Sequence, residues 1–200
     1  MLEGKYIAIE GNIGAGKTSL ARLLAKRFNG SLLLEEFAEN TFLPQFYKDP
    51  ERFAFPLEMS FMAERYGQMK KKFDSHVEKN LIISDFIFDK SLLFARVNLK
   101  EDELKLFENF YNLVKDFMPK PDLLIFIKRE ETQLKINIEK RGRSFEKEIG
   151  SDYLKKLNES YDQFLTSNVS LRKLVFSSKD LDFVTNKMDF ELIVDKILNS

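Results

Sequence analysis

The segment from Gly11 to Thr18 carries the residue types needed to hold a nucleoside triphosphate. It reads Gly-x-x-x-x-Gly-Lys-Thr and follows an apolar run at residues 6–9. Glycines bring backbone N–H groups close to an anion, Lys17 can reach the β- and γ-phosphates, and the Thr18 hydroxyl can ligate Mg²⁺. A complete match in a strand–loop–helix setting favours phosphate binding over a plain Gly-rich turn. The expected phosphate-site residues are Gly11, Asn12, Ile13, Gly14, Ala15, Gly16, Lys17 and Thr18.

Composition narrows the possible functions. The 200 residues, 44% of them hydrophobic and 32% charged, suit a single globular domain with a substantial core. Zero net charge gives no overall attraction to nucleic acid or to an anionic membrane. Without cysteine and with His76 as the single histidine, thiol catalysis, cysteine-based zinc sites and a Ser-His-Asp triad are not expected. The longest apolar run, 123–127, is too short to span a membrane, and an early first strand argues against a signal peptide, so we expect a cytoplasmic protein.

Apolar runs alternate with helical repeats, which predicts an α/β fold with a parallel sheet and one domain over residues 1–200. The predicted strands are 6–9, 31–34, 81–84, 123–127 and 174–176. The predicted helices are 19–28, 43–48, 53–73, 92–97, 103–117, 130–141, 152–165 and 189–198. Ligands of such sheets bind beyond the carboxyl ends of the strands, so the Gly11–Thr18 loop, Glu35 and Asp85 are expected to meet at one edge.

Several stretches together resemble the deoxyribonucleoside kinases, the family of deoxycytidine, deoxyguanosine and deoxyadenosine kinases. The stretches are Glu-Gly-Asn-Ile-Gly at 10–14, Glu35 after the second strand, Tyr-Lys-Asp-Pro-Glu-Arg at 47–52, and Arg-Gly-Arg at 141–143 with Glu146. The resemblance implies a P-loop kinase with three layers, a five-stranded parallel sheet flanked by helices, and a short arginine-containing lid at about residues 141–150. It also implies a homodimer. The activity it implies is transfer of the γ-phosphoryl group of ATP, with Mg²⁺, to the 5′-hydroxyl of a 2′-deoxyribonucleoside.

The resemblance also implies roles for the acidic residues. Glu35 matches the general base, and a carboxylate within reach of a neutral alcohol suits that chemistry; Glu36 is the competing assignment. Asp85 matches the acid that serves Mg²⁺. The family usually follows this acid with Arg and Ser, whereas this chain has Phe and Ile there. Asp89 is a second candidate for the acid, and Lys90 or the lid arginines could supply the missing positive charge.

Other residues match positions around the sugar, the phosphates and the base. Tyr47 and Glu146 match residues that hold the sugar 3′-hydroxyl, and Phe94 matches an aromatic that stacks on the base, although it could equally be a core residue. Arg141 and Arg143 could hold phosphoryl oxygens or simply form a basic helix end. The glycine between them favours the lid interpretation.

Glu58 occupies the position where the family usually has a base-reading Gln. Arg65 lies two helical turns further on the same predicted face. An ionised Glu accepts hydrogen bonds and donates none, which suits the N1–H and amino donors of guanine, while Arg suits its O6 and N7 acceptors. We therefore predict a purine pocket with deoxyguanosine ahead of deoxyadenosine. The alternative is an ion pair between Glu58 and Arg65.

Three rival functions share parts of this pattern. A nucleoside monophosphate kinase would need further cations to hold an acceptor phosphate. The tetrapeptide Asn-Lys-Met-Asp at 186–189 matches the guanine-reading motif of small GTPases, but eleven residues follow it and no Asp-x-x-Gly occurs, so chance is the better explanation. A non-catalytic P-loop module is disfavoured by the presence of Lys17, Thr18, Glu35 and both lid arginines.

Overall fold

The structure, a computed structural model, describes residues 2–36, 40–75, 80–177 and 181–200, and of residue 147 only the main chain. His76 lies outside these residues. The strands are β1 (Tyr6–Gly11), β2 (Ser31–Leu33), β3 (Ile82–Ser84), β4 (Leu123–Lys128) and β5 (Lys173–Ser177). The helices are α1 (Lys17–Phe28), α2 (Leu43–Lys48), α3 (Pro50–Asp74), α4 (Lys90–Asn98), α5 (Glu101–Val114), η1 (Lys115–Phe117), α6 (Glu131–Arg141), η2 (Ser144–Glu148), α7 (Ser151–Ser167) and α8 (Lys187–Leu198).

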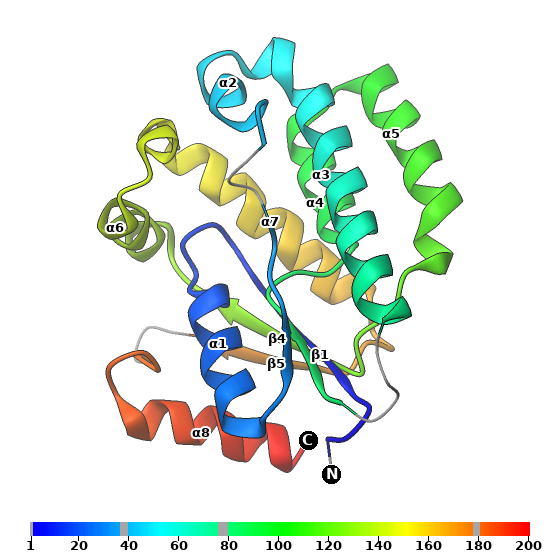
Figure 1. The fold of residues 1–200 in the computed structure, drawn as a ribbon. Helices are drawn as coiled ribbons and strands as arrows, with labels where there is room; N and C mark the ends of the chain where they lie inside the picture. The colour runs from blue at the N-terminus through cyan, green and yellow to red at the C-terminus, as the bar shows by residue number, and fades with distance from the viewer. Residues whose placement is uncertain (1, 37–39, 76–79, 178–180) are drawn as a thin grey trace.

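The strands form one parallel sheet in the order β2-β3-β1-β4-β5. β1 lies in the middle, with Ala8 opposite Ser84 of β3 on one side and Leu124 of β4 on the other. Both chain ends lie at the end of the molecule away from α2 (Figure 1). The predicted five-stranded parallel sheet flanked by helices is confirmed.

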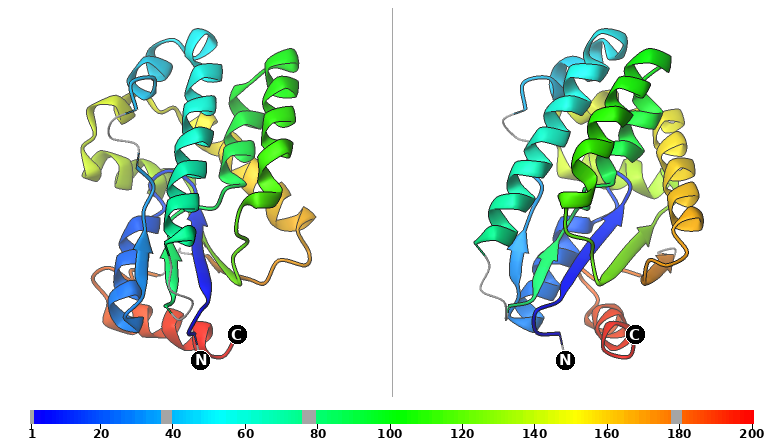
Figure 2. Two further views of the ribbon diagram at one scale, coloured as in Figure 1. Left: turned by 45° about the vertical axis from the view of Figure 1, so that its right-hand side comes forward. Right: turned by 90° about the vertical axis from the view of Figure 1, so that its right-hand side faces the viewer.

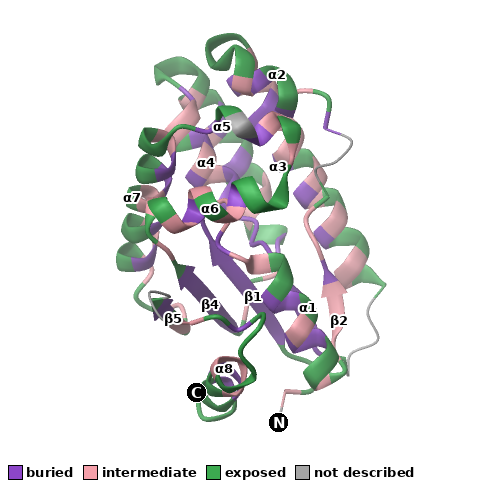
Figure 3. Ribbon diagram, turned by 90° about the vertical axis from the view of Figure 1, so that its left-hand side faces the viewer, coloured by how far each residue is buried: buried purple, intermediate pink, exposed green. Residues whose placement is uncertain are grey.

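The alternation of side chains along β1 divides the core between two faces of the sheet. Ile7 and Ile9 pack with α1, α6 and α8, whereas Tyr6 and Ala8 pack with the residues of α3, α4, α5 and α7. β1 and β4 are buried almost throughout (Figure 3). On the second face, α3, α4 and α5 stand side by side beyond the carboxyl ends of the strands (Figure 2). These helices border the region where we expect a ligand to bind.

Helix α3 begins at Pro50, earlier than the predicted start at residue 53. Asp49 is its N-cap, because its side chain accepts a hydrogen bond from the Arg52 N–H at 3.3 Å. Proline fits the first helical position, where its missing N–H would be unpaired in any case. The helix predicted at 103–117 likewise ends at Val114 and continues as the 3₁₀ turn η1.

The Asn-Lys-Met-Asp tetrapeptide starts α8. Asn186 is the N-cap and accepts a hydrogen bond from the Met188 N–H at 2.9 Å. The Asp189 carboxylate accepts one from the Asp182 N–H at 2.7 Å. These two hydrogen bonds account for Asn186 and Asp189 without a guanine ligand. Among the described residues, no helix is long and apolar enough to cross a membrane.

Candidate active site

The loop between β1 and α1 has the backbone conformation that its glycines permit. Gly14 and Gly16 have φ angles of 82° and 98°, in the left-handed region that other residues rarely adopt. A Cβ atom on Gly14 would lie 2.8 Å from the Leu134 carbonyl oxygen, so a side chain there would clash with α6. The loop carries Lys17 and Thr18 into the first turn of α1, whose positive end favours phosphate.

Lys17 bends back over this loop. Its ammonium group donates hydrogen bonds to the carbonyl oxygens of Gly11 at 2.8 Å and Asn12 at 3.0 Å. Burial and the nearby charge of Lys90 lower the pKa of Lys17 to about 8. The ammonium group therefore lies at the mouth of the loop, where a phosphate oxygen would compensate its charge.

Asp85 links the phosphate loop to the end of β2. Its Oδ2 accepts a hydrogen bond from the Thr18 hydroxyl, and its Oδ1 accepts one from the Glu35 N–H at 2.8 Å. A hydroxyl and a carboxylate are the hard oxygen donors that Mg²⁺ takes, and phosphates and water normally complete its shell. The pair Thr18 and Asp85 therefore fits a magnesium ion bound together with a nucleotide.

The Glu35 side chain points into the cleft and is 13% exposed, whereas Glu36 is exposed. Lys90 Nζ donates to its Oε2 at 2.5 Å, and Arg65 Nε donates to its Oε1 at 2.8 Å. Burial alone would raise the pKa of Glu35, but the charges of Lys90 and Arg65 outweigh it and lower that pKa to about 2. Glu35 is thus fixed in orientation and fully ionised near neutral pH.

Lys90, one of the candidates for the positive charge, contacts Glu35. It is the first residue of α4, is 5% exposed, and its ammonium group also lies 5.5 Å from the centre of the Phe94 ring. The sequence offered Lys90 as one of several candidates. The structure places its ammonium group in contact with Glu35.

Glu10 is a buried acid that the sequence analysis did not single out. Its oxygens accept hydrogen bonds from the Ile87 N–H at 3.0 Å, the Tyr161 hydroxyl at 2.8 Å and the Gly11 N–H at 3.2 Å. Burial raises the pKa of its carboxyl. Glu10 therefore ties β1 to α7 and to the turn that carries Lys90. An ionisable residue in an otherwise apolar strand was the signal that could have identified it.

Glu58 lies on α3 at the other end of the cleft and is 1% exposed. Asn98 Nδ2 donates a hydrogen bond to its Oε1 at 2.6 Å. The ion pair considered between Glu58 and Arg65 does not form, because Arg65 binds Glu35 and donates to the Ser91 hydroxyl at 2.9 Å. Asn98 was not identified from the sequence, since its contact depends on the packing of α4 against α3.

The lid arginines meet Glu146. Arg141 NH2 lies 2.5 Å from Glu146 Oε1, and Arg143 NH1 lies 3.1 Å from the same oxygen. Gly142 has φ 71° and is the C-cap of α6, so it ends a helix. The inference that Gly142 argues against a helix cap was therefore wrong, although both arginines do line the cleft.

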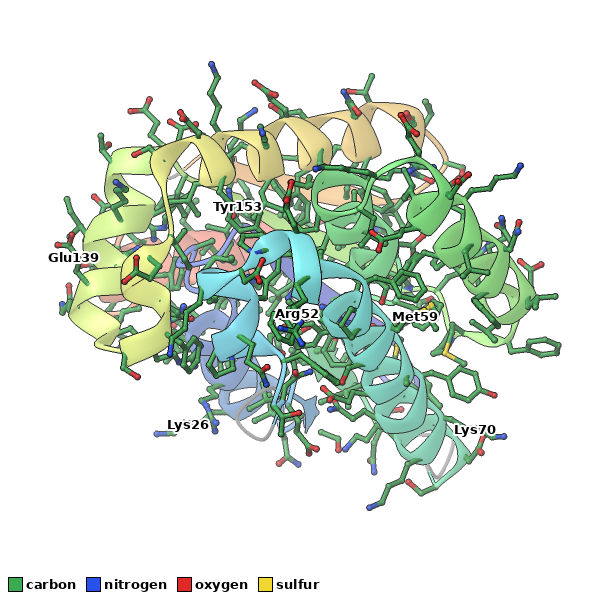
Figure 4. The ribbon with its side chains drawn as sticks, turned by 90° about the horizontal axis from the view of Figure 1, so that it is seen from above. Lys26, Arg52, Met59, Lys70, Glu139 and Tyr153 are labelled. Carbon is green, nitrogen blue, oxygen red and sulfur yellow. The ribbon has the colours of Figure 1, made fainter. Side chains whose placement is uncertain are left out.

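Tyr47 and Phe94 line the same cleft, together with Tyr153 of α7. The Tyr47 ring stacks on Phe145 with centroids 6.4 Å apart, and the Tyr153 ring lies 6.2 Å from that of Phe46. Seen from above, Tyr153 is on the side of α7 that faces α2 and α3 (Figure 4). The cleft thus has aromatic side chains in its wall as well as charged ones.

One predicted site residue lies elsewhere. The Asp89 carboxylate accepts a hydrogen bond from the Tyr111 hydroxyl at 2.9 Å and lies in a groove between α4, α5 and α7. Asp89, the second candidate for the acid, therefore does not line the cleft, because α4 starts here and turns Asp89 and Lys90 in different directions. The other predicted side chains Lys17, Thr18, Glu35, Tyr47, Glu58, Arg65, Asp85, Phe94, Arg141, Arg143 and Glu146 share one cleft.

Comparison with known proteins assigns the chain to a family. The family model for deoxynucleoside kinases matches residues 7–200. A deoxyguanosine kinase of Bacillus subtilis is 38% identical over 94% of this chain and 93% of its own length. A deoxyadenosine kinase of Dictyostelium discoideum is 36% identical over 82% of this chain and 68% of its own length. The solved structure of deoxyadenosine kinase from M. mycoides with bound dATP superposes with a TM-score of 0.84 at 29% identity, covering 98% of this chain and all of that one. The chain therefore belongs to the deoxynucleoside kinase family, and its fold is that of the P-loop kinases.

Proposed function

We propose that the protein transfers the γ-phosphoryl group of ATP to the 5′-hydroxyl of a purine 2′-deoxyribonucleoside, with deoxyguanosine preferred when Glu58 is ionised. The observation that carries the proposal is the cleft that Lys17, Thr18, Glu35 and Glu58 share. Glu35 connects its two parts, because its N–H donates to Asp85 beside Thr18 and its carboxylate binds Arg65 of α3, the helix that carries Glu58. Such a cleft suits a substrate whose hydroxyl meets Glu35 while its base reaches Glu58. The deoxyguanosine and deoxyadenosine kinases among the relatives support a purine substrate.

In the proposed reaction, the 5′-oxygen attacks the γ-phosphorus while the bond from that phosphorus to the β–γ bridging oxygen breaks and ADP leaves. The hydroxyl proton passes to Glu35. A carboxylate with a pKa of about 2 is a weak base, so it first orients the hydroxyl and takes the proton as the new bond forms. Lys90 and Arg65 keep the carboxylate in this orientation.

The phosphate end of the cleft is proposed to hold the triphosphate through the backbone N–H groups of the glycine-rich loop and through Lys17. Mg²⁺, when bound at Thr18 and Asp85, would neutralise charge on the β- and γ-oxygens. Arg141 and Arg143 are proposed to contact the transferring group, which requires them to exchange contacts with Glu146 for contacts with phosphoryl oxygens. Tyr47 and Glu146 are proposed to bind the sugar 3′-hydroxyl, and Phe94 to stack on the base.

The direct test is a panel of nucleosides with ATP and Mg²⁺ in which monophosphate formation is measured. Deoxyguanosine and deoxyadenosine should have the highest kcat/KM, and guanosine should be much poorer than deoxyguanosine. A clear preference for deoxycytidine or thymidine would contradict the purine assignment. Including deoxyguanosine monophosphate in the panel separates this activity from that of a nucleoside monophosphate kinase.

The homodimer expected from the sequence is also proposed, with a cytoplasmic location. Four exposed apolar side chains follow one face of α5 and η1, at helical spacing: Leu106, Phe110, Leu113 and Phe117. Exposed apolar stripes of this kind mark contact surfaces. Light scattering after size-exclusion chromatography should give twice the chain mass, and a monomer mass at micromolar concentration would contradict the dimer.

A further inference from the structure

The base end of the cleft contains a carboxylate oxygen with unsatisfied bonding capacity. Within the described part of the chain, Glu58 Oε2 is the buried side-chain oxygen or nitrogen that has no hydrogen-bond partner. Glu58 is 1% exposed and lines the cleft. Leaving a buried polar atom unpaired is unfavourable. An unpaired oxygen at the end of a ligand cleft therefore indicates that the ligand supplies the partner.

Asn98 determines which oxygen of Glu58 can carry a proton. Its amide nitrogen donates to Oε1 at 2.6 Å, so Oε1 must act as an acceptor there. The Asn98 side chain also lowers the pKa of Tyr153, so the two side chains lie near each other beside Glu58. When Glu58 is protonated, the proton therefore resides on Oε2. The cleft then presents a donor at Oε2, and when Glu58 is ionised it presents an acceptor.

The charges around Glu58 come from each element packed against it. Arg65 on α3 and Lys90 on α4 favour the ionised carboxylate, and Glu35 after β2 opposes it. Tyr47 on α2 and Tyr153 on α7 also lie near Glu58, because its charge raises the pKa of both hydroxyls. Burial is the largest influence and raises the pKa of Glu58 to about 7, against the opposing effects of Arg65 and Asn98. Both protonation states are consequently populated near neutral pH.

The two purine bases differ in the group they would present to Oε2. Guanine carries a hydrogen on N1 and a neighbouring amino group, so its Watson–Crick edge donates to a carboxylate. Adenine has an unprotonated N1 that accepts, so it requires a donor at the same place. An enzyme that reads this edge gains most of its discrimination from whether a buried group is paired or left unpaired.

We propose that the proton on Glu58 Oε2 selects the purine base, so that ionised Glu58 binds deoxyguanosine and protonated Glu58 binds deoxyadenosine. Asn98 is the residue that directs this proton to Oε2, the oxygen without a partner. This inference rests on the proposed purine deoxynucleoside kinase activity. It adds that base preference is set by one titrating side chain and changes with pH.

The test measures kcat/KM for deoxyguanosine and for deoxyadenosine with saturating ATP and Mg²⁺. The pH is varied from about 5.5 to about 8.5, a range centred on the raised pKa of Glu58. Ionisations that both substrates share, such as those of Lys17 and ATP, cancel in the ratio of the two constants. The deoxyguanosine-to-deoxyadenosine ratio should rise about tenfold per pH unit, because one base needs the ionised form and the other the protonated form. Equilibrium binding of each deoxynucleoside without ATP should follow the same trend.

Two variants separate the switch from a general pH effect. In Glu58→Gln the amide does not titrate, so the ratio should become independent of pH. In Asn98→Ala the carboxylate loses a donor that stabilises its charge, so the ratio at a given pH should fall by about two- to tenfold. Glu108→Gln is the matched control, because its carboxylate pairs with Arg96 on the outer side of α4, and it should keep the ratio of the unmodified protein.

The outcomes distinguish failure of the proton switch from failure of the proposed kinase activity. If both purines are phosphorylated but their ratio stays constant with pH in the unmodified protein, the proton switch is wrong and the proposed function stands. If Glu58→Gln retains the pH dependence, another group controls it and the switch is equally wrong. If no purine deoxynucleoside is phosphorylated, the proposed function fails and the switch fails with it.

Discussion

Lys90 Nζ lies 2.5 Å from Glu35 Oε2, and both groups are largely buried, with side-chain exposures of 6% and 13%. The pair joins the start of α4 to the end of β2 across 55 positions of sequence. Positive charge predominates around this carboxylate, because Arg65 contacts the other oxygen of Glu35 and Lys17 contributes a further positive charge. Lys90 therefore sets both the direction and the basicity of the carboxylate proposed to accept the 5′-hydroxyl proton.

Replacing Lys90 should change the pH dependence of catalysis. In Lys90→Met, Glu35 loses the largest of the charges that lower its pKa, so this pKa should rise from about 2 and the acid limb of the kcat/KM profile should move to higher pH. At neutral pH kcat should fall by about 10–100-fold because the carboxylate loses its orientation. Lys100→Met, which removes an exposed pair with Glu51, should leave the profile unchanged. An unchanged acid limb in Lys90→Met would show that Lys90 does not set the pKa of Glu35.

Glu58 should also make the free protein less stable at alkaline pH. A carboxyl whose folded pKa is raised contributes stability that is fully present below the unfolded pKa of about 4.5 and is lost as pH rises through the folded pKa of about 7. Glu58→Gln should therefore stabilise the protein by up to about 3 kcal/mol at pH 8 relative to its effect at pH 5. Urea unfolding of both proteins at the two pH values gives this difference. The same effect at both pH values would show that Glu58 does not titrate in this range.

Asp85 should govern the requirement for magnesium. Asp85→Asn keeps an acceptor for the Glu35 N–H but removes the negative charge beside Thr18. Because charged oxygen ligands set the affinity for Mg²⁺, the Mg²⁺ concentration for half-maximal activity should rise by about tenfold or more. Asp89→Asn is the control, since Asp89 bonds to Tyr111 outside the cleft. Equal magnesium dependence in the Asp85 and Asp89 variants would remove Asp85 from the metal site.

Tyr47 should contribute to recognition of the sugar 3′-hydroxyl. Tyr47→Phe removes one hydroxyl and should raise KM for deoxyguanosine by about 3–10-fold, the effect of one hydrogen bond, with a smaller effect on kcat. With 2′,3′-dideoxyguanosine the same substitution should have little effect, because the partner hydroxyl is already absent. An equal loss with both substrates would mean that Tyr47 acts through packing against Phe46 and Phe145.

The fold and the phosphate site could be predicted from local sequence because their determinants are local. The spacing of Gly11, Gly16 and Lys17 fixes the loop, and apolar runs of strand length fix the sheet. The predicted start of α3 at residue 53 was wrong because Pro50, after a capping Asp49, begins the helix. Helix ends depend on such single contacts, which periodicity does not reveal.

The interior of the site was less predictable because its contacts join distant segments. Glu10 reaches Ile87 across 77 positions, and Asn98 reaches Glu58 across 40. Neither pairing has a sequence spacing that identifies it. Asp89 and Lys90 were both candidates from one short stretch. The first turn of α4 directs Lys90 into the cleft and Asp89 toward Tyr111, and the sequence does not show this difference. Glu35 could be identified because it lies just after the second predicted strand and matches an acid of the family that the sequence resembles.

The central claim, that Glu35 accepts the 5′-hydroxyl proton, is tested most directly by Glu35→Gln assayed with deoxyguanosine and by nucleotide binding. We predict that kcat falls by about 10²–10⁴-fold, the range for loss of a general base, while the dissociation constant for ATP with Mg²⁺ changes less than about threefold. Retention of kcat within a few-fold of the unmodified protein, with normal nucleotide binding, would contradict the proposed mechanism.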